Sequence, residues 1–179
     1  MSELVERARA FAAKAHEGQT RLNKAKTPLV AHLEEVVSLV RESGGNDEEL
    51  AAAWLHDVIE DTPVLFTDVA KNFGDKVASI VFGLTDPPKF SGLHTLERKT
   101  AQAERVRFLN DSVKRVKIAD QTSNVRSVTT DSPVNWDTQK CLDYTEGARK
   151  IVFECQDVSE FLFGKFCEAY WAAIKVHKK

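Results

Sequence analysis

The stretch AAAWLHDVIED, residues 51–61, decides the fold and carries the densest chemistry of the chain. Small and apolar residues lead into His56 and Asp57, and Glu60 and Asp61 follow one helical turn later. Side chains four residues apart share a helix face, so a continuous helix would pair each residue of His56-Asp57 with one of the later carboxylates. The four side chains would then form one compact group.

This group needs a compensating charge if the helix is buried. The alanines, Trp54 and Leu55 ahead of it can pack closely enough to bury His56. An isolated His-Asp pair in a helix is usually a solvent-facing pair or a structural histidine. Four imidazole and carboxylate groups near an apolar turn, however, cost several kcal/mol unless a cation lies among them. We therefore predict a divalent metal ion here.

Helical patterning continues on both sides of this stretch. Asn46, with Glu49 three residues later, is typical of a helix N-terminus, and Pro63 indicates the end of the central helix. No β-alternation of useful length, Gly-rich phosphate loop or internal repeat occurs. We predict an all-α bundle of about eight to ten helices. Further helices are expected within residues 2–17, 27–42, 66–74, 75–86, 93–109, 113–128, 135–155 and 157–177.

The last two of these helices are predicted to be packing elements. Their aromatic and aliphatic stripe is far more often core than part of a cofactor site. The cysteines Cys141, Cys155 and Cys167 fit no zinc pattern and indicate buried thiols in a reducing compartment. The residues expected in the core are Phe153, Phe161, Leu162, Phe166, Tyr170, Trp171 and Ile174.

Length and charge exclude several classes of protein. The 179 residues suffice for one domain, and we treat residues 1–179 as a single domain. A formal net charge of −2 and a pI of about 6.2 lack the strong positive field of a general nucleic-acid binder. The N-terminus has no signal-peptide core, and no apolar run is long enough to span a bilayer. We expect a cytoplasmic protein with no nucleic-acid or membrane partner.

Positive charge is concentrated in one segment. Between Arg98 and Lys117 there are seven basic and two acidic residues. One interpretation is a solvated helix face, and the other is a rim that binds phosphate groups. The polar loop QTRLNKAKT adds Arg21 and Lys24, which could also face a ligand.

Two further positions could contribute metal ligands. His32, near the start of the second predicted helix, would by itself more often be structural. Asp120, Asn124 and Ser127 form a polar stripe, which is usually a solvent face. The apolar residues Ile118 and Ala119 nevertheless indicate that Asp120 lies in a mostly buried turn and needs a partner.

Together these residues match a known family. His32, His56-Asp57 and Asp120 offer an N₂O₂ ligand set that suits Mn²⁺, Fe²⁺ or Zn²⁺, and their arrangement resembles the HD phosphohydrolase superfamily. The segments AKAHEGQTR, TPLVAH, AAAWLHDVIEDT, FGDKVASIVFGLTD, LERK and VKIADQTSNVRS occur in the order seen in Rel/Spo-type alarmone hydrolases. They are most similar to the stand-alone small alarmone hydrolases, of the metazoan type. The resemblance covers about residues 5–130, and HDVIEDT is its most specific part.

The resemblance implies an HD-domain helical bundle and a role for each motif residue. It implies that the four N₂O₂ residues hold the metal, usually Mn²⁺, with Zn²⁺ or Fe²⁺ as alternatives. Glu60 and Asp61 would position and activate the attacking water. The residues expected to contact substrate are Arg21 against the base, Asn124 and Ser127 on the base and ribose side, and Lys24.

The implied reaction removes the 3′-diphosphate of ppGpp or pppGpp and gives GDP or GTP plus pyrophosphate. Leu22, Leu29 and Gln121 depart from the family pattern, all on the nucleotide side and none in the metal set. Base identity therefore stays open, and pppApp or the 2′-phosphate of NADPH are alternative substrates. A general HD-type nucleotidase and a non-catalytic alarmone sensor are the competing functions. The sequence leaves the oligomeric state open.

Overall fold

The computed structural model describes residues 2–178, and within that range it contains helices and two isolated β-bridges but no strand. The predicted all-α bundle is confirmed. No helix in residues 2–178 combines the length and apolar character that a membrane span requires. The helices are α1 (Glu3–Ala15), α2 (Leu29–Glu42), α3 (Asp47–Leu55), α4 (Val58–Asp61), α5 (Phe66–Phe73), α6 (Asp75–Leu84), α7 (Thr95–Val106), α8 (Asp111–Thr130), α9 (Thr138–Phe153) and α10 (Glu160–His177), with short 3₁₀ turns at Pro88–Phe90 and Gln156–Val158.

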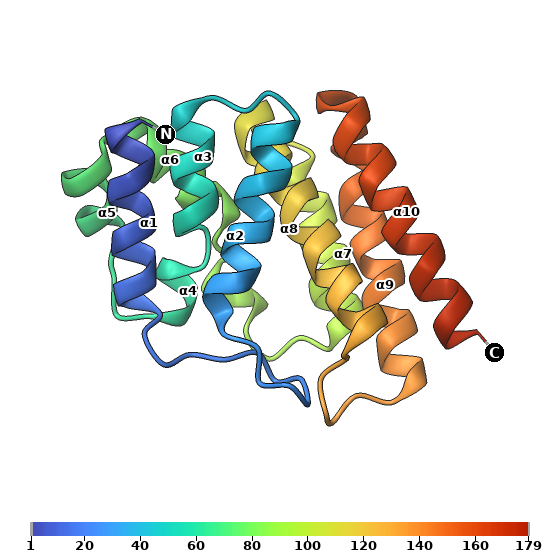
Figure 1. The fold of residues 1–179 in the computed structure, drawn as a ribbon. Coiled ribbons are helices and arrows are strands. Elements are labelled where there is room, and N and C mark those ends of the chain that lie inside the picture. The colour runs from blue at the N-terminus through green and yellow to red at the C-terminus, as the bar shows by residue number, and fades with distance from the viewer. Residues whose placement is uncertain (1, 179) are drawn as a thin grey trace.

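Helix α8 is the central element of the bundle. It packs against α2, α6, α9 and α10, while α1 packs on α3 and α7 on α9. Figure 1 shows α1, α3, α2, α8 and α10 as upright helices that follow one another from left to right. The loops from α1 to α2 and from α8 to α9 meet at the lower end, where Asn23 bridges to Pro133. These loops help to enclose the site described below.

The predicted continuous helix over residues 51–61 is wrong. Helix α3 begins with the predicted capping box, because Asn46 and Glu49 exchange hydrogen bonds of 2.9 Å. It ends at Leu55, and the four-residue helix α4 begins at Val58. In an uninterrupted helix the carbonyl oxygen of Ala53 would accept a hydrogen bond from the amide of Asp57. Nδ1 of the His56 side chain lies 2.8 Å from this same oxygen. His56 and Asp57 therefore lie at a joint between two helices.

The aromatic stripe of the C-terminal helices is core only in part. Leu162 and Phe166 are buried, but Phe153, Phe161 and Trp171 are 43, 38 and 66 % exposed. Helix α10 is the outermost helix and packs on α8 and α9 with one face, so the residues on its other face lack neighbours. Cys141 and Cys155 are buried as expected, and Cys167 is half-buried.

Candidate active site

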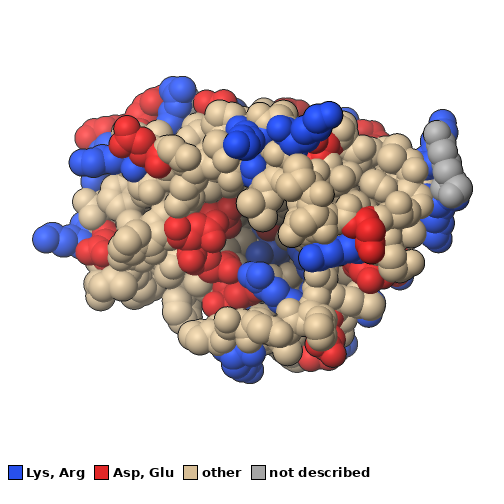
Figure 2. All heavy atoms as spheres, turned by 90° about the horizontal axis from the view of Figure 1, so that it is seen from below, with Lys and Arg blue, Asp and Glu red and all other residues tan. Residues whose placement is uncertain are grey.

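A cavity of about 460 Å³ opens at the lower end of the bundle. Figure 2 looks at this end and shows acidic side chains along one side of a hollow, with basic side chains inside it and opposite. His56 lies buried behind the cavity wall, and Lys24 is exposed and is not among the lining residues. The remaining predicted site residues all line the cavity: Arg21, His32, Asp57, Glu60, Asp61, Asp120, Asn124 and Ser127.

The two imidazoles turn the same nitrogen toward the same point. Nδ1 of His56 faces the Ala53 carbonyl at 2.8 Å, and because a carbonyl only accepts, this nitrogen carries the proton. Nδ1 of His32 lies 2.8 Å from the hydroxyl oxygen of Ser123. Nε2 of His56 is thus the nitrogen with a lone pair to offer, and Nε2 of His32 faces the same carboxylates. The rings meet edge to face, with centroids 5.2 Å apart.

Two carboxylates complete a four-membered cluster. Nε2 of His56 lies 3.3 Å from Oδ2 of Asp57 and 3.7 Å from Oδ1 of Asp120. Nε2 of His32 lies 3.5 Å from the same oxygen of Asp120 and 4.0 Å from Oδ2 of Asp57. The cluster draws on helix α2, on the joint between α3 and α4, and on the middle of α8.

These residues fit a divalent cation. Nε2 of His56 is buried and has no hydrogen-bond partner, which is costly unless another group occupies its lone pair. Two neutral imidazoles and two carboxylates form a donor set that borderline divalent metals favour. One ligand atom each from His32, His56 and Asp57 lie within 4.8 Å of one another.

The charges in the cluster also favour a bound cation. Burial alone would lower the pKa of His56, but Asp57 and Asp120 raise it to about 9. The carboxylates therefore favour a positive charge at Nε2, which a proton supplies in the metal-free protein and a metal ion would replace. Burial alone would raise the pKa of Asp57, but His56 lowers it to about 2. The nearby imidazole of His32, whose Nε2 lies 3.5 Å from Oδ1, and the charge of Lys117 outweigh burial at Asp120 and hold its pKa well below the usual range. The two carboxylates are therefore ionised and attract positive charge between them.

Asp120 is fixed by neutral amides on both oxygens. Nδ2 of Asn124 donates to Oδ1 at 2.6 Å, and Nε2 of Gln121 donates to Oδ2 at 2.7 Å. Gln121 is 2 % exposed and accepts a 2.6 Å hydrogen bond from Nζ of Lys99. The expectation that Gln121 stays clear of the predicted metal set is therefore wrong. Because it follows Asp120 in a buried helix, its side chain turns inward onto that carboxylate.

Arg21 and Asn124 contact each other across the cavity wall. Nη2 of Arg21 donates to Oδ1 of Asn124 at 2.6 Å, which leaves the amide nitrogen of Asn124 for Asp120. Both ends of this amide are thus engaged within the protein. Leu22, beside Arg21, is 70 % exposed at the rim of the cavity.

Glu60 and Asp61 are consecutive residues of α4 that both line the cavity but are held differently. Oε1 of Glu60 accepts from Nη2 of Arg98 at 2.9 Å, and Oε2 accepts from the amide of Asp86 at 3.2 Å. The backbone carbonyl of Asp61 accepts from Nε2 of Gln19 at 3.1 Å, and its carboxylate is exposed. Burial and the nearby Asp86 charge raise the pKa of Glu60, and burial and the Asp57 charge raise that of Asp61. Both carboxyl groups consequently hold a proton more readily than usual.

The basic segment divides between the cavity and structural contacts. Arg98, Lys99 and Lys117 line the cavity, as the phosphate-rim interpretation requires. Arg105 instead donates to the carbonyls of Phe82 and Gly83. The structure therefore supports the rim for three of the seven basic residues and a structural role for Arg105.

Lys99 is the most perturbed of these cations. It is 6 % exposed, and its Nζ lies 4.1 Å from the ring centre of Tyr144. Burial lowers its pKa to about 7, despite the opposing effect of Asp120. A buried ammonium beside an open cavity gains energy from an anionic ligand.

Sequence reasoning missed several side chains around the cavity. Ser123 lies one turn after Asp120, so a closer reading of the polar stripe would have found it. Trp136 and Tyr144 form one wall, with ring centres 5.1 Å apart. Nothing in the sequence marks these two aromatics as cavity residues, because the α8–α9 loop and α9 reach the site only through the fold.

Comparisons with known proteins identify the family. A sequence model of the HD domain matches residues 8–143, which include the whole four-membered cluster. The chain belongs to the HD-domain family. HD domains are metal-dependent, which agrees with the donor set described above.

Within the HD-domain family, the chain groups with MESH1 proteins. It is 33 % identical over 157 residues to the guanosine-3′,5′-bis(diphosphate) 3′-pyrophosphohydrolase MESH1 of Xenopus tropicalis, covering 87 % of this chain and 86 % of that protein. The Homo sapiens MESH1 is 33 % identical over 144 residues, or 79 % of each chain. A solved structure described as a metazoan ortholog of SpoT that hydrolyzes ppGpp superposes with a TM-score of 0.87 at 30 % identity and covers 96 % of both chains.

Proposed function

We propose that this chain is a metal-dependent 3′-pyrophosphohydrolase that converts ppGpp or pppGpp and water into GDP or GTP and pyrophosphate. The observation that carries the proposal is the cluster of two imidazoles and two carboxylates that borders the cavity lined by Glu60 and Asp61. The activity for which the MESH1 relatives are named supports the same substrate class.

His32, His56, Asp57 and Asp120 would hold the ion, which we propose to be Mn²⁺. Zn²⁺ and Fe²⁺ suit the same mixed nitrogen and oxygen donors. When bound, a divalent ion supplies Lewis acidity and makes water easier to deprotonate. The predicted ligand roles rest on the orphaned Nε2 of His56 and on the distances within the cluster.

The carboxylates of α4 would handle the proton of the attacking water. Water attacks the phosphorus bonded to the ribose 3′ oxygen, that P–O bond breaks, and the ribose oxygen must regain a proton. Glu60, Asp61 and Asp131 are the cavity carboxylates outside the predicted ligand set. Asp131 accepts from the backbone amides of Lys24 and Ala25, whereas the raised pKa values of Glu60 and Asp61 suit groups that take up and return protons. Because Arg98 and the Asp86 amide fix Glu60, its carboxylate needs little reorganisation during the reaction.

The cavity cations would bind the diphosphate. Arg98, Lys99 and Lys117 come from α7 and α8 and line the cavity, and Nζ of Lys117 lies 3.7 Å from Oδ2 of Asp120. Fixed cations in a partly buried site neutralise a phosphate more effectively than cations in water. They would also stabilise the charge that develops as pyrophosphate forms.

The predicted base contacts favour a second candidate substrate. Arg21 can stack on either purine, and stacking does not distinguish bases. Asn124 is the side chain expected to hydrogen-bond to the base edge, but it already accepts from Arg21 and donates to Asp120. A site with no side chain free to hydrogen-bond to the base edge does not distinguish guanine from adenine, so we include pppApp as the alternative substrate. Ser127 stays a predicted ribose contact and Lys24 a predicted substrate contact.

The proposal also covers organisation and setting. We take residues 1–179 as a single HD hydrolase domain, which the shared hydrophobic core of the described helices supports. We place the enzyme in the cytoplasm, as its free thiols support. No nucleic-acid or membrane partner is part of the proposal.

Product analysis tests the proposal directly. The protein is stripped of metal with a chelator, reloaded with Mn²⁺ and incubated separately with ppGpp, pppApp, NADPH and purine 5′-monophosphates. We expect GDP and pyrophosphate in equal amounts from ppGpp, and none from a control Asp57→Asn protein. Release of orthophosphate from 5′-monophosphates, with ppGpp untouched, would instead assign a general nucleotidase. Binding of ppGpp without turnover would assign a sensor.

A further inference from the structure

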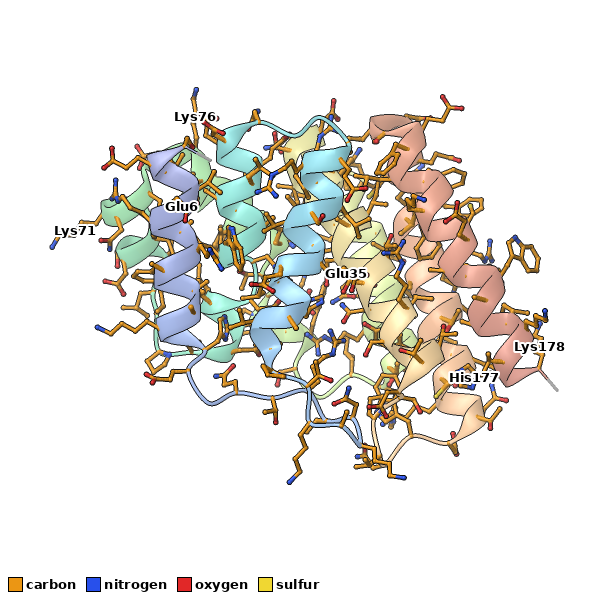
Figure 3. The ribbon with its side chains drawn as sticks, viewed as in Figure 1. Glu6, Glu35, Lys71, Lys76, His177 and Lys178 are labelled. Atoms are coloured by element: carbon orange, nitrogen blue, oxygen red, sulfur yellow. The ribbon has the colours of Figure 1, made fainter. Side chains whose placement is uncertain are left out.

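His32 is linked to a carboxylate through a serine hydroxyl. Its Nδ1 lies 2.8 Å from Oγ of Ser123, and the same Oγ lies 2.6 Å from Oε2 of Glu35. His32 and Ser123 are buried, and Glu35 is half-buried. Figure 3 labels Glu35 on α2, on the side that faces α8.

The direction of each hydrogen bond follows from the acceptor at the outer end. An ionised carboxylate only accepts, so the hydroxyl of Ser123 must give its one proton to Glu35. Its oxygen then has only lone pairs left for His32. Nδ1 of His32 must therefore carry the ring proton, and Nε2 keeps the lone pair that faces Asp57 and Asp120.

Glu35 is itself anchored. Nη1 of Arg126 donates to its other oxygen, Oε1, at 2.8 Å. Burial alone would raise the pKa of Glu35, but the hydrogen bonds from Ser123 and Arg126 lower it, so the carboxylate stays charged. The residues alternate across the helix contact, because His32 and Glu35 lie on α2 and Ser123 and Arg126 lie on α8. We call this chain of hydrogen bonds from Arg126 through Glu35 and Ser123 to His32 the relay. Its residues lie one turn apart on two packed helices.

The two histidines of the cluster are oriented by different means. His56 gives its Nδ1 proton to a backbone carbonyl, which no substitution removes. His32 depends entirely on side chains. The tautomer of His32 can therefore be changed by a single substitution, while that of His56 cannot.

We propose that Ser123 and Glu35 are positioning residues that hold His32 in the Nδ1-protonated form and thereby present Nε2 to the metal ion. The inference rests on the metal site of the proposed function. Partners of this kind on ligating histidines typically contribute 10–100-fold to metal affinity or activity. The ionised Glu35 fixes the direction of the Ser123 hydroxyl proton. The Ser123 oxygen can then only accept from Nδ1 of His32, which fixes the tautomer and the orientation of the ring.

Two readouts other than turnover test this proposal. Two-bond nitrogen–proton NMR spectra of the metal-free protein report which nitrogen of His32 is protonated, and calorimetry with Mn²⁺ reports metal affinity. We expect Ser123→Ala to produce a mixture of His32 tautomers and to weaken Mn²⁺ binding about 10–100-fold. Ser123→Thr, which keeps the hydroxyl, should restore the wild-type tautomer and affinity.

A second variant and a control guard against misfolding. Glu35→Gln changes only the charge of a half-buried side chain and should weaken Mn²⁺ binding less than Ser123→Ala does. Thr122→Val removes a buried hydroxyl that bonds only to the Ile118 carbonyl of its own helix. This control should leave the His32 tautomer and the Mn²⁺ affinity unchanged even if it lowers the melting temperature.

The outcomes separate this inference from the proposed function. A single Nδ1-protonated tautomer in Ser123→Ala, with Mn²⁺ affinity within about twofold of wild type, would overturn the relay. Failure of the Mn²⁺-loaded protein to hydrolyse ppGpp, alongside the expected tautomer and affinity changes, would overturn the proposed substrate and support the relay.

Discussion

Arg98 holds Glu60 from a helix that lies far along the chain. Its Nη2 donates to Oε1 of Glu60 at 2.9 Å, while its Nε donates to Asp86 at 2.7 Å. Helix α4 has only four residues and too few hydrogen bonds of its own to fix a side chain. The position of the Glu60 carboxylate is therefore set by α7 and by the segment that follows α6.

Removal of this contact should affect turnover and spare the metal. Arg98→Gln frees the Glu60 carboxylate, and misplacement of a reacting group by about 1 Å costs roughly 10²-fold in rate. We expect a fall in kcat of that order with unchanged Mn²⁺ affinity. Arg105→Gln is the matched control, since Arg105 lies on the same helix and donates to carbonyls outside the cavity. Equal loss of kcat in both variants would contradict a specific role for Arg98.

The two carboxylates of α4 should act in the chemical step. Combined substitution of Glu60→Gln and Asp61→Asn keeps size and hydrogen bonding but removes the ability to take up a proton. Turnover of ppGpp should fall by roughly 10² or more, the range for lost acid–base catalysis. Calorimetry should find Mn²⁺ still bound. Loss of the metal along with activity would move these residues into the ligand set.

Lys99 should give the free protein a distinct pH dependence of stability. Its pKa is about 7 in the folded state against an ordinary 10.5. Between these values the unfolded chain binds more protons than the folded protein, so the free energy of unfolding rises with pH across that window. Urea unfolding of the metal-free protein from pH 7 to pH 10 should show this rise, and Lys99→Met should flatten it. An equal slope in both proteins would contradict the assignment.

Gly147 should be required for the close approach of α9 to α7. A Cβ at this position would lie 2.5 Å from Cβ and 2.7 Å from Cγ of Lys99. Gly147→Ala should therefore destabilise the protein by about 1–3 kcal/mol and raise KM, because Lys99 is pushed from its place. Gly164→Ala on α10 is the control, since its Cβ meets nothing within 4 Å. Chemical denaturation should find that variant more stable by up to about 1 kcal/mol.

Local signals predicted much of the fold. The Asn46–Glu49 capping box and most helix spans follow from hydrogen-bonding types and apolar spacing, and the structure confirms them. The joint at His56–Asp57 was not predictable in this way. Helical spacing continues through it, and the break depends on where the His56 side chain finds its acceptor.

The site residues that belong to recognisable sequence motifs were predictable. The residues next to those motifs in the sequence were not. The structure brings His32, His56, Asp57 and Asp120 together as expected. The contact of Gln121 with Asp120 was missed because the residue type alone does not show which way its side chain points from the helix. The outward-facing aromatics of α10 were misjudged because apolar character predicts burial only where another element covers the face.

The three tryptophans occupy three separate environments, which gives the protein a built-in optical assay. Trp54 is 3 % exposed in the core, so its emission should shift only when the protein unfolds. Trp171 is 66 % exposed and should emit like an indole in water throughout. Trp136 lines the cavity beside Tyr144. A purine that stacks near it quenches its fluorescence, so nucleotide occupancy can be followed without a label in a Trp171→Phe background.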